Sequence, residues 1–213
     1  MTGTLRFRVL SRDKLAQHTF SAAEDGDLRS GDRFSFSLGH GLNPAWATVE
    51  QVHGSDVLVV SEPGVGGEAD GLVTSTPGLP LAVFTADCLG VVFESERAVG
   101  VAHAGWRGLD AGVLEATRDR MVGLGGAPLR AIAGPAIGPC CFEVGPEVAD
   151  RFPRSLGTTS WGTVSVDLVG EARRRLTDMS FETEGGCTRC DDRYFSFRNG
   201  DRTKRMAAVG WIR

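Results

Sequence analysis

Short apolar segments follow one another between residues 57 and 102, and this arrangement limits the fold more than any other feature of the chain. The segments are rich in valine and are separated by Gly, Pro or Asp, as β-strands are. Several are apolar at consecutive positions, which is typical of inner strands covered on both faces. The predicted strands are 57–60, 71–74, 81–84, 89–93 and 99–102. An alternating segment, LRFRVL at 5–10, predicts a further, half-buried strand.

Two helices are expected in the second half of the chain. Asp110 is placed to cap a helix whose apolar residues lie between 113 and 124 and which Gly125-Gly126 ends. A second helix is predicted to start near Asp167 and to carry apolar residues as far as Met179. Because 213 residues suit one domain, we expect a single α/β domain with mixed β-sheets over 1–213. A Rossmann fold is excluded because no glycine fingerprint follows the first predicted strand.

Charge and hydropathy exclude several kinds of partner. The formal net charge of −4 lacks the basic surface that nucleic acids or anionic membranes attract. The apolar stretch 79–93 is interrupted by Thr85 and Asp87 and is shorter than the ~20 residues of a membrane span. The first residues, MTGTLRFRVLS, lack the apolar core of a secretion signal, so a cytoplasmic location is expected.

The chain has five cysteines, an odd number that favours reduced thiols over a disulfide framework. Cys187 and Cys190 form a CxxC pair. A structural zinc site normally needs a second pair or two histidines nearby, and none follows this one in the sequence. The CxxC pair is therefore interpreted as incidental.

Three candidate metal ligands lie at predicted strand ends or turns, where a rigid sheet can position functional groups. His53 precedes the strand at 57–60, Cys88 follows the strand at 81–84, and His103 follows the strand at 99–102. Two imidazoles and a thiolate that converge in space leave a fourth position for water or substrate, as catalytic zinc requires. The same atoms also suit a Cys88 nucleophile with His103 as its base, and the spacing leaves both hypotheses open.

Other candidate residues lie close to this trio in the sequence. In the segment HAGWRG, Arg107 and Gly105 precede a predicted helix start, a setting that favours binding of an anion such as phosphate. The alternative is that Arg107 only stacks on Trp106. Gly138 is a second candidate phosphate-binding glycine, in a loop interpreted as a pocket wall. Asp87 is a candidate to orient a ligand or transfer a proton, or else to cap a turn.

These segments together resemble the YfiH/YlmD family, described as multicopper polyphenol oxidases or laccases and later as purine nucleoside phosphorylases. The matching pieces are QVHGSDV, ADGLVT, TADCLGVVF, VAHAGWRGL, AIGPCCFEVGPEV and CTRCDDRYFSFRNGDRTKR. They occur in family order from residue 35 onward, and TADC together with HAGWRG is a specific signal.

The resemblance implies a zinc enzyme that phosphorolyses adenosine, inosine, guanosine and 5′-methylthioadenosine and that also deaminates adenosine. It implies that His53, Cys88 and His103 are the zinc ligands. It also implies that the fold is a mixed β-sheet sandwich flanked by helices, similar to cysteine-hydrolase toxins. Copper is a weaker candidate for the metal than zinc. The chain has only four histidines, against roughly ten in a multicopper oxidase, and it lacks paired His-x-His elements. A binding protein without activity is a further alternative.

The chain departs from the family pattern at several positions. The segment at about 20–45 is shortened, and Ser37 stands at the usual Asn. Phe142 stands where the family commonly has Tyr, Asn199 where it has Arg, and Lys204 where it has Gly. These changes concern the expected nucleoside pocket and leave the three metal ligands in place.

Overall fold

The computed structural model describes residues 16–31 and 33–213; the strand predicted at 5–10 lies outside them. The helices are α1 (Arg33–His40), α2 (Trp106–Ala111), α3 (Val113–Gly123), α4 (Pro146–Ala149) and α5 (Leu168–Arg175), with 3-10 turns at Ala23–Asp25 and Phe197–Asn199. Most of the remaining regular structure is β-sheet.

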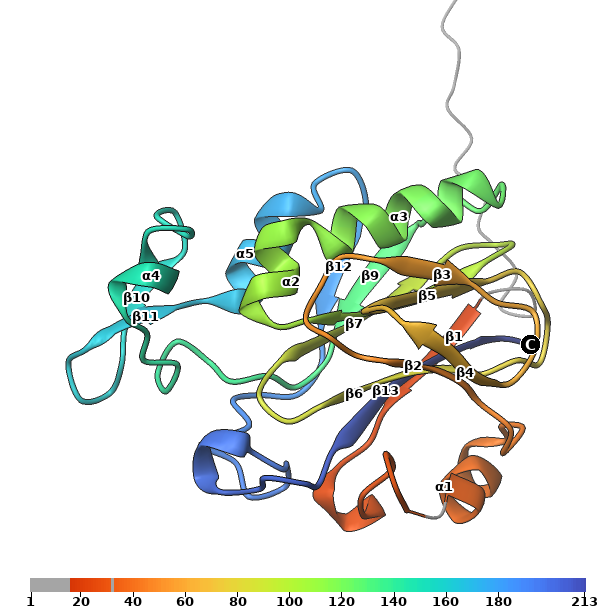
Figure 1. The fold of residues 1–213 in the computed structure, drawn as a ribbon, viewed down its shortest axis with the longest axis horizontal. Coiled ribbons are helices and arrows are strands. Elements are labelled where there is room, and N and C mark those ends of the chain that lie inside the picture. Colours follow the sequence, from red (N-terminus) through yellow and green to blue (C-terminus); the bar gives the residue numbers. More distant parts are fainter. Residues whose placement is uncertain (1–15, 32) are drawn as a thin grey trace, which may run out of the picture.

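Two mixed sheets form the body of the protein (Figure 1). The six-stranded sheet has the order β12 (Ser180–Thr183), β9 (Arg130–Ala133), β7 (Leu89–Glu94), β8 (Val99–Ala104), β5 (Gly71–Thr74) and β3 (Val57–Val59). The five-stranded sheet has the order β1 (Ala16–Phe20), β13 (Met206–Ile212), β6 (Leu81–Thr85), β2 (Ala47–Glu50) and β4 (Gly64–Glu68). A separate hairpin pairs β10 (Leu156–Thr158) with β11 (Val164–Val166).

The two sheets pack face to face and share a core. Strand β6 illustrates how the sequence produces this arrangement, because successive side chains point to opposite faces. Leu81 and Val83 face the other sheet, where they join Val92 and Val101. Ala82 faces outward and packs in a different cluster. The strand is therefore buried on both sides, as its unbroken apolar sequence predicts.

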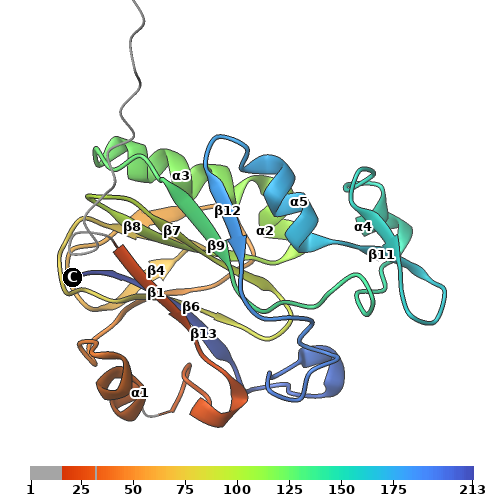
Figure 2. The ribbon, with the colours of Figure 1, turned by 180° about the vertical axis from the view of Figure 1, so that it is seen from behind.

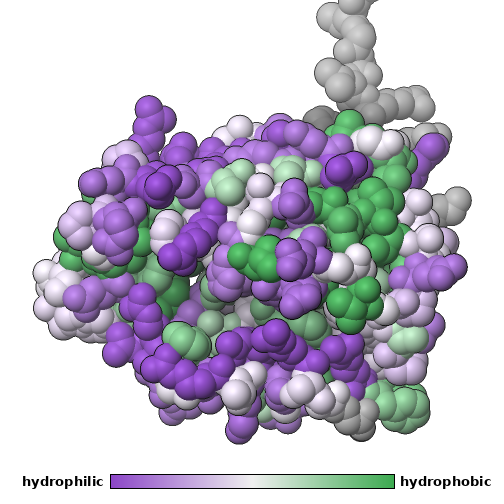
Figure 3. All heavy atoms as spheres, in the orientation of Figure 1, coloured by the Kyte–Doolittle hydropathy of each residue, from purple (hydrophilic) through white to green (hydrophobic). Residues whose placement is uncertain are grey.

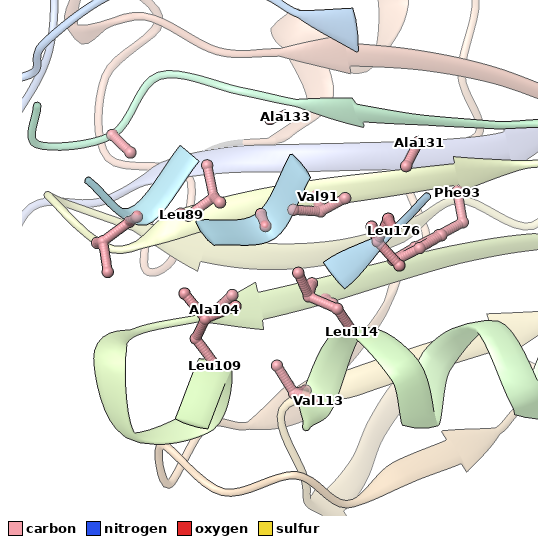
Figure 4. Close-up of a cluster of buried hydrophobic side chains, with 14 of the residues drawn as sticks. Leu89, Val91, Phe93, Ala104, Leu109, Val113, Leu114, Ala131, Ala133 and Leu176 are labelled. Carbon is pink, nitrogen blue, oxygen red and sulfur yellow. The ribbon is translucent and has the colours of Figure 1, made fainter. Parts of the chain in front are cut away.

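Helices cover the outer faces of both sheets (Figures 1 and 2). Helices α2, α3 and α5 lie over the six-stranded sheet, where apolar side chains of both layers meet (Figure 4). Phe93, Leu109 and Leu114 are fully buried there. Helix α1 lies on the far side of the five-stranded sheet, where Phe36 packs against Trp46. The observed architecture is thus a mixed α/β sandwich flanked by helices, as predicted.

The strands predicted between 57 and 102 are all present within two residues of their expected ends. The expected Asp110 cap is wrong: α2 already begins at Trp106, so Asp110 lies inside it. Gly112 separates α2 from α3 with a left-handed backbone (φ 91°), which glycine adopts without steric cost. The helix predicted near Asp167 is α5. The Asp167 side chain caps this helix by accepting a hydrogen bond from the Gly170 amide. The helix ends at Arg175, four residues before the predicted Met179.

The face shown in Figure 3 is mostly hydrophilic, with apolar atoms gathered over the side that carries β3 and β4. Val59 and Val65 are among the exposed apolar residues of those strands. Among the described residues, no helix combines the length and the apolar character needed to cross a membrane.

Candidate active site

Loops at one end of the sandwich surround a cavity of about 300 Å³. Its wall combines segments that are far apart in the sequence, including the ends of β2 and β6, the start of α2 and the loop before β13. The lining residues are Arg29, Val49, Gln51, His53, Phe84, Ala86, Asp87, Cys88, His103, Trp106, Ile137, Phe142, Leu168, Phe197, Arg198 and Arg205. This volume is at the lower end of the range of small-molecule sites, roughly 300–1,000 Å³.

The three predicted metal ligands meet in this cavity. His53 lies between β2 and β3, Cys88 in the turn between β6 and β7, and His103 near the end of β8. One donor atom from each lies within 4.8 Å of the others. The Cys88 Sγ atom is 3.9 Å from His53 Nε2, and the two imidazole rings meet edge to face with centroids 4.8 Å apart. The structure therefore brings together residues that are up to 50 positions apart in the sequence.

Asp70, which the sequence analysis missed as a site residue, holds this group together. Its carboxylate accepts a hydrogen bond from His103 Nδ1 at 2.7 Å and others from the backbone amides of Val52, His53 and Gly54. Burial opposes ionisation of Asp70, but the hydrogen bonds from His103 and Gly54 outweigh it and lower the carboxyl pKa. One buried carboxylate thus orients both histidine-bearing segments. Its sequence signal is its place in the ADGLVT segment, directly before a buried strand.

Two residues at the site hold an unusual backbone conformation. His53 (φ 61°) and Asp87 (φ 85°) are the non-glycine residues with positive φ in the described part of the chain. Such conformations cost on the order of 1–3 kcal/mol and persist where the surroundings enforce them. At His53 the enforcing contacts are the bonds from the 52–54 backbone to Asp70. The strain is therefore maintained at a residue that contributes a donor atom to the group of three.

Cys88 and His103 shift each other's pKa toward the charged forms. Burial favours the neutral thiol, but the charge of His103 and hydrogen bonds from both histidines lower the pKa of Cys88 to about 6. Burial also opposes a charged His103, yet the Cys88 thiolate and Asp70 raise its pKa to about 9. The lowered pKa favours the thiolate, which is the form that binds metals and attacks electrophiles.

The donor set fits a catalytic metal site. Asp70 occupies Nδ1 of His103, so Nε2 is the nitrogen left to bind a metal, in the carboxylate–histidine–metal arrangement common in such sites. Two imidazoles and one thiolate can fill three of the four coordination positions of a zinc ion. All three residues line the cavity, so a metal that they held would be accessible to a substrate bound there.

Gly105 leaves space for the side chains of His53 and Cys88. A Cβ atom at this position would lie 2.9 Å from the His53 ring and 3.0 Å from Cys88 Sγ. We expect Gly105→Ala to weaken metal binding by about 5- to 100-fold, since overpacking of this kind costs about 1–3 kcal/mol. Competition with a chromogenic chelator measures this affinity. Gly123→Ala in α3 is the control, because open space surrounds Gly123; equal metal affinity in both variants would contradict this account.

The other predicted site residues have different positions. Arg107 is exposed and its guanidinium stacks on Trp106 at 4.2 Å; of the two, Trp106 lines the cavity. Asp87 uses both carboxylate oxygens to hold the cavity wall, accepting from the Thr188 hydroxyl at 2.7 Å and the Arg198 amide at 2.8 Å. Gly138 lies beside Cys140 and Cys187.

Arginines at other positions line the cavity. Arg198 reaches across to the carbonyl oxygen of Glu143 and lies over the Phe142 ring. Arg29 and Arg205 also contribute to the wall. The shortened segment near the N-terminus thus still supplies a lining residue, and within it Ser37 accepts a hydrogen bond from the Trp46 indole.

The premise that the CxxC pair has no partner is wrong. Cys140 and Cys141, almost fifty residues earlier in the sequence, lie next to Cys187 and Cys190 in space. All five cysteines are free thiols, as the odd number predicts.

Fold and site together define a class: mixed α/β sandwiches with a Cys/His group, able to hold a metal, at the end of the sheets. Residues 29–213 match the family described as "Multi-copper polyphenol oxidoreductase laccase". The chain belongs to this family, that of YfiH and YlmD, which confirms the resemblance seen in the motifs.

Named relatives and solved structures agree with this assignment. The chain is 40% identical to "Purine nucleoside phosphorylase YfiH" of Escherichia coli (strain K12) over 182 residues, which cover 79% of this chain and 74% of that protein. It is 40% identical over 188 residues to "Purine nucleoside phosphorylase ORF3" of Streptomyces griseus, covering 81% and 76% of the two chains. The crystal structure of YlmD from Geobacillus stearothermophilus superposes with a TM-score of 0.80 at 27% identity, covering 93% and 92% of the two chains.

Proposed function

We propose that this protein is a zinc-dependent purine nucleoside phosphorylase that works at the His53–Cys88–His103 group. The observation that carries the proposal is the convergence of these three donors on one cavity that is also lined by arginines. The names of the relatives support it. The proposed substrates are adenosine, inosine, guanosine and 5′-methylthioadenosine, each with phosphate.

The chemistry of the cavity wall suits both substrates. Aromatic side chains from separate loops, Trp106, Phe142 and Phe197, can stack on a purine. Guanidinium groups can hold phosphate by charge-assisted hydrogen bonds. In the reaction, a phosphate oxygen forms a bond to the anomeric carbon and the bond to the purine nitrogen breaks. The purine takes that electron pair and a proton, and ribose 1-phosphate remains.

The chain's own residues orient this displacement. Arg107 was the sequence-based candidate for phosphate, and Arg198 lines the cavity beside Asp87. His53, Cys88 and His103 would hold the zinc, which supplies Lewis-acid chemistry to a substrate group when bound. Asp70 keeps His103 in the tautomer with its proton on Nδ1.

The two arginines can be distinguished by kinetics. We expect Arg198→Ala to raise the KM for phosphate about 10- to 100-fold, because a hydrogen bond to a charged group contributes about 1.5–3 kcal/mol. Arg107→Ala should change it less, because its guanidinium stacks on Trp106. Steady-state kinetics with varied phosphate give both values. A larger rise for Arg107→Ala would assign phosphate to Arg107 instead.

Adenosine deamination is proposed as a second reaction of the same site. Water would attack the purine carbon that bears the amino group, and ammonia would leave. One chromatographic assay with adenosine separates the two reactions. Adenine that forms only with phosphate supports the phosphorylase, whereas inosine that forms without phosphate supports the deaminase. If zinc-loaded protein forms neither adenine nor inosine, the proposal is overturned.

A Cys–His hydrolase is the second candidate, favoured by the lowered pKa of Cys88 beside His103 and by the hydrogen bond from His103 to Asp70. The two functions differ in the role of the metal: the phosphorylase needs it, whereas a hydrolase would be inhibited by a metal bound to its thiolate nucleophile. Activity that rises on metal removal would favour the hydrolase. Multicopper oxidase chemistry fits less well, because His18 pairs with Glu94 and His40 stacks on Phe36 rather than joining the group.

A further inference from the structure

Four cysteines form a second cluster that the proposed reaction does not use. Cys140 and Cys141 follow β9, and Cys187 and Cys190 follow β12. All four sulfur atoms lie within 4.8 Å of one another. Cys190 Sγ is 3.1 Å from Cys141 Sγ and 3.6 Å from Cys140 Sγ. Zinc bound tetrahedrally at about 2.3 Å requires sulfur atoms about 3.8 Å apart, so the cluster has nearly the required size.

The backbone holds both cysteine pairs in place. The Cys190 amide donates to the Cys187 carbonyl and the Cys141 amide to the Gly138 carbonyl, so each pair lies on a tight turn. A parallel bridge between Ala136 and Cys187 joins the two turns.

The surroundings of Cys187 suit a thiolate ligand. The Gly138 amide donates a hydrogen bond to Cys187 Sγ at 3.2 Å. A Cβ atom on Gly138 would lie 3.3 Å from Cys140 Sγ, so glycine allows the sulfur atoms to approach. Four thiolates and one zinc ion carry a net charge of −2. Arg189, inside the CxxC turn, brings a positive charge to the cluster through its contact with the Cys141 carbonyl.

We propose that Cys140, Cys141, Cys187 and Cys190 bind one structural zinc ion, separate from the metal at Cys88. A tetrahedral set of four sulfur ligands selects zinc or iron. The short distances fit a single ion, and a closed four-cysteine site is the usual form of structural zinc. Binding displaces the thiol protons.

This zinc ion would fix the wall of the cavity. The first turn leads to Ile137 and Phe142 and the second to Phe197 and Arg198, all of which line the cavity. Hydrogen bonds already join these two segments: the Thr188 amide donates to the Ala136 carbonyl, and the Arg198 side chain donates to the Glu143 carbonyl. A four-sulfur site would therefore act as a cross-link between two segments that form the substrate pocket.

The test counts zinc per chain by mass spectrometry of the metal in protein purified without chelators. We expect about two zinc ions in the wild type, about one in Cys88→Ser, and about one in Cys187→Ser/Cys190→Ser. The double variant should also melt roughly 10 °C lower. Zinc-free Cys88→Ser protein would overturn the proposal, and so would iron in place of zinc.

A second measurement does not depend on folding of the double variant. Cys88→Ser protein loaded with Co²⁺ should show the strong sulfur-to-cobalt absorption of a four-thiolate site. A chelator should remove that absorption and make four thiols reactive toward a thiol reagent. Bound cobalt that lacks this absorption would contradict the zinc site. So would an intact protein mass that is lower by two hydrogens, because it would show a disulfide between Cys141 and Cys190.

Discussion

Cys88→Ala is expected to abolish phosphorolysis and to remove the metal from the His53–Cys88–His103 group. Alanine takes away the thiolate, which is one of three donors and the charge partner of His103. We expect kcat/KM to fall by at least about 10²–10³-fold, the typical cost of losing one group that stabilises the transition state. Zinc content and steady-state kinetics on the same preparation measure both effects.

A matched pair of histidine variants controls for nonspecific damage. His53 and His40 are both exposed, but His40 lies on α1 and stacks on Phe36, on the far side of the five-stranded sheet. His53→Ala should therefore behave like Cys88→Ala, whereas His40→Ala should keep its metal and its activity. Full turnover of Cys88→Ala without bound zinc would refute a metal mechanism.

Asp70→Asn is expected to have the second largest effect, although Asp70 itself is not a proposed ligand. The amide side chain has one acceptor oxygen, whereas the carboxylate accepts from His103 and from three backbone amides. Loss of a partner that orients a metal-binding histidine typically lowers metal affinity about 10- to 100-fold. Breaking a buried charge pair also destabilises the fold by about 3 kcal/mol or more. Metal titration and chemical unfolding measure the two losses separately.

Glu94→Gln is the matched control for Asp70→Asn. Glu94 is also a fully buried carboxylate, and it accepts a hydrogen bond from His18 and another from Arg130. This variant should lose stability as well, but it should keep its affinity for metal. Equal loss of metal affinity in both variants would show that Asp70 acts only through general stability.

The strands between 57 and 102 could be predicted because short buried segments bounded by Gly, Pro and Asp carry a local signal. The break between α2 and α3 could not, since the sequence predicts one helix from an Asp110 cap to Gly125-Gly126, and Gly112 falls inside that range. Its left-handed backbone depends on how the two helices pack, and propensity alone does not reveal it. Helix α1 was missed because its sequence, RFSFSLGH, holds serine and glycine that are weak helix formers.

The candidate site shows the same division between local and long-range information. His53, Cys88 and His103 could be proposed because each follows or precedes a clear strand. Asp70 was missed because its partner His103 is 33 residues away, and its place before a buried strand does not by itself identify a histidine partner. The four-cysteine cluster was missed for the same reason: its two pairs approach only through the parallel pairing of β9 with β12 and the bridge beyond it.

One measurement tests the central claim most directly: phosphorus NMR of zinc-loaded protein with adenosine and phosphate, beside the Cys88→Ala variant. The account predicts that the ribose 1-phosphate resonance grows with the wild type, in step with free adenine, and is absent with Cys88→Ala. Unchanged phosphate with the wild type, or equal ribose 1-phosphate from both proteins, would contradict phosphorolysis at the His53–Cys88–His103 group.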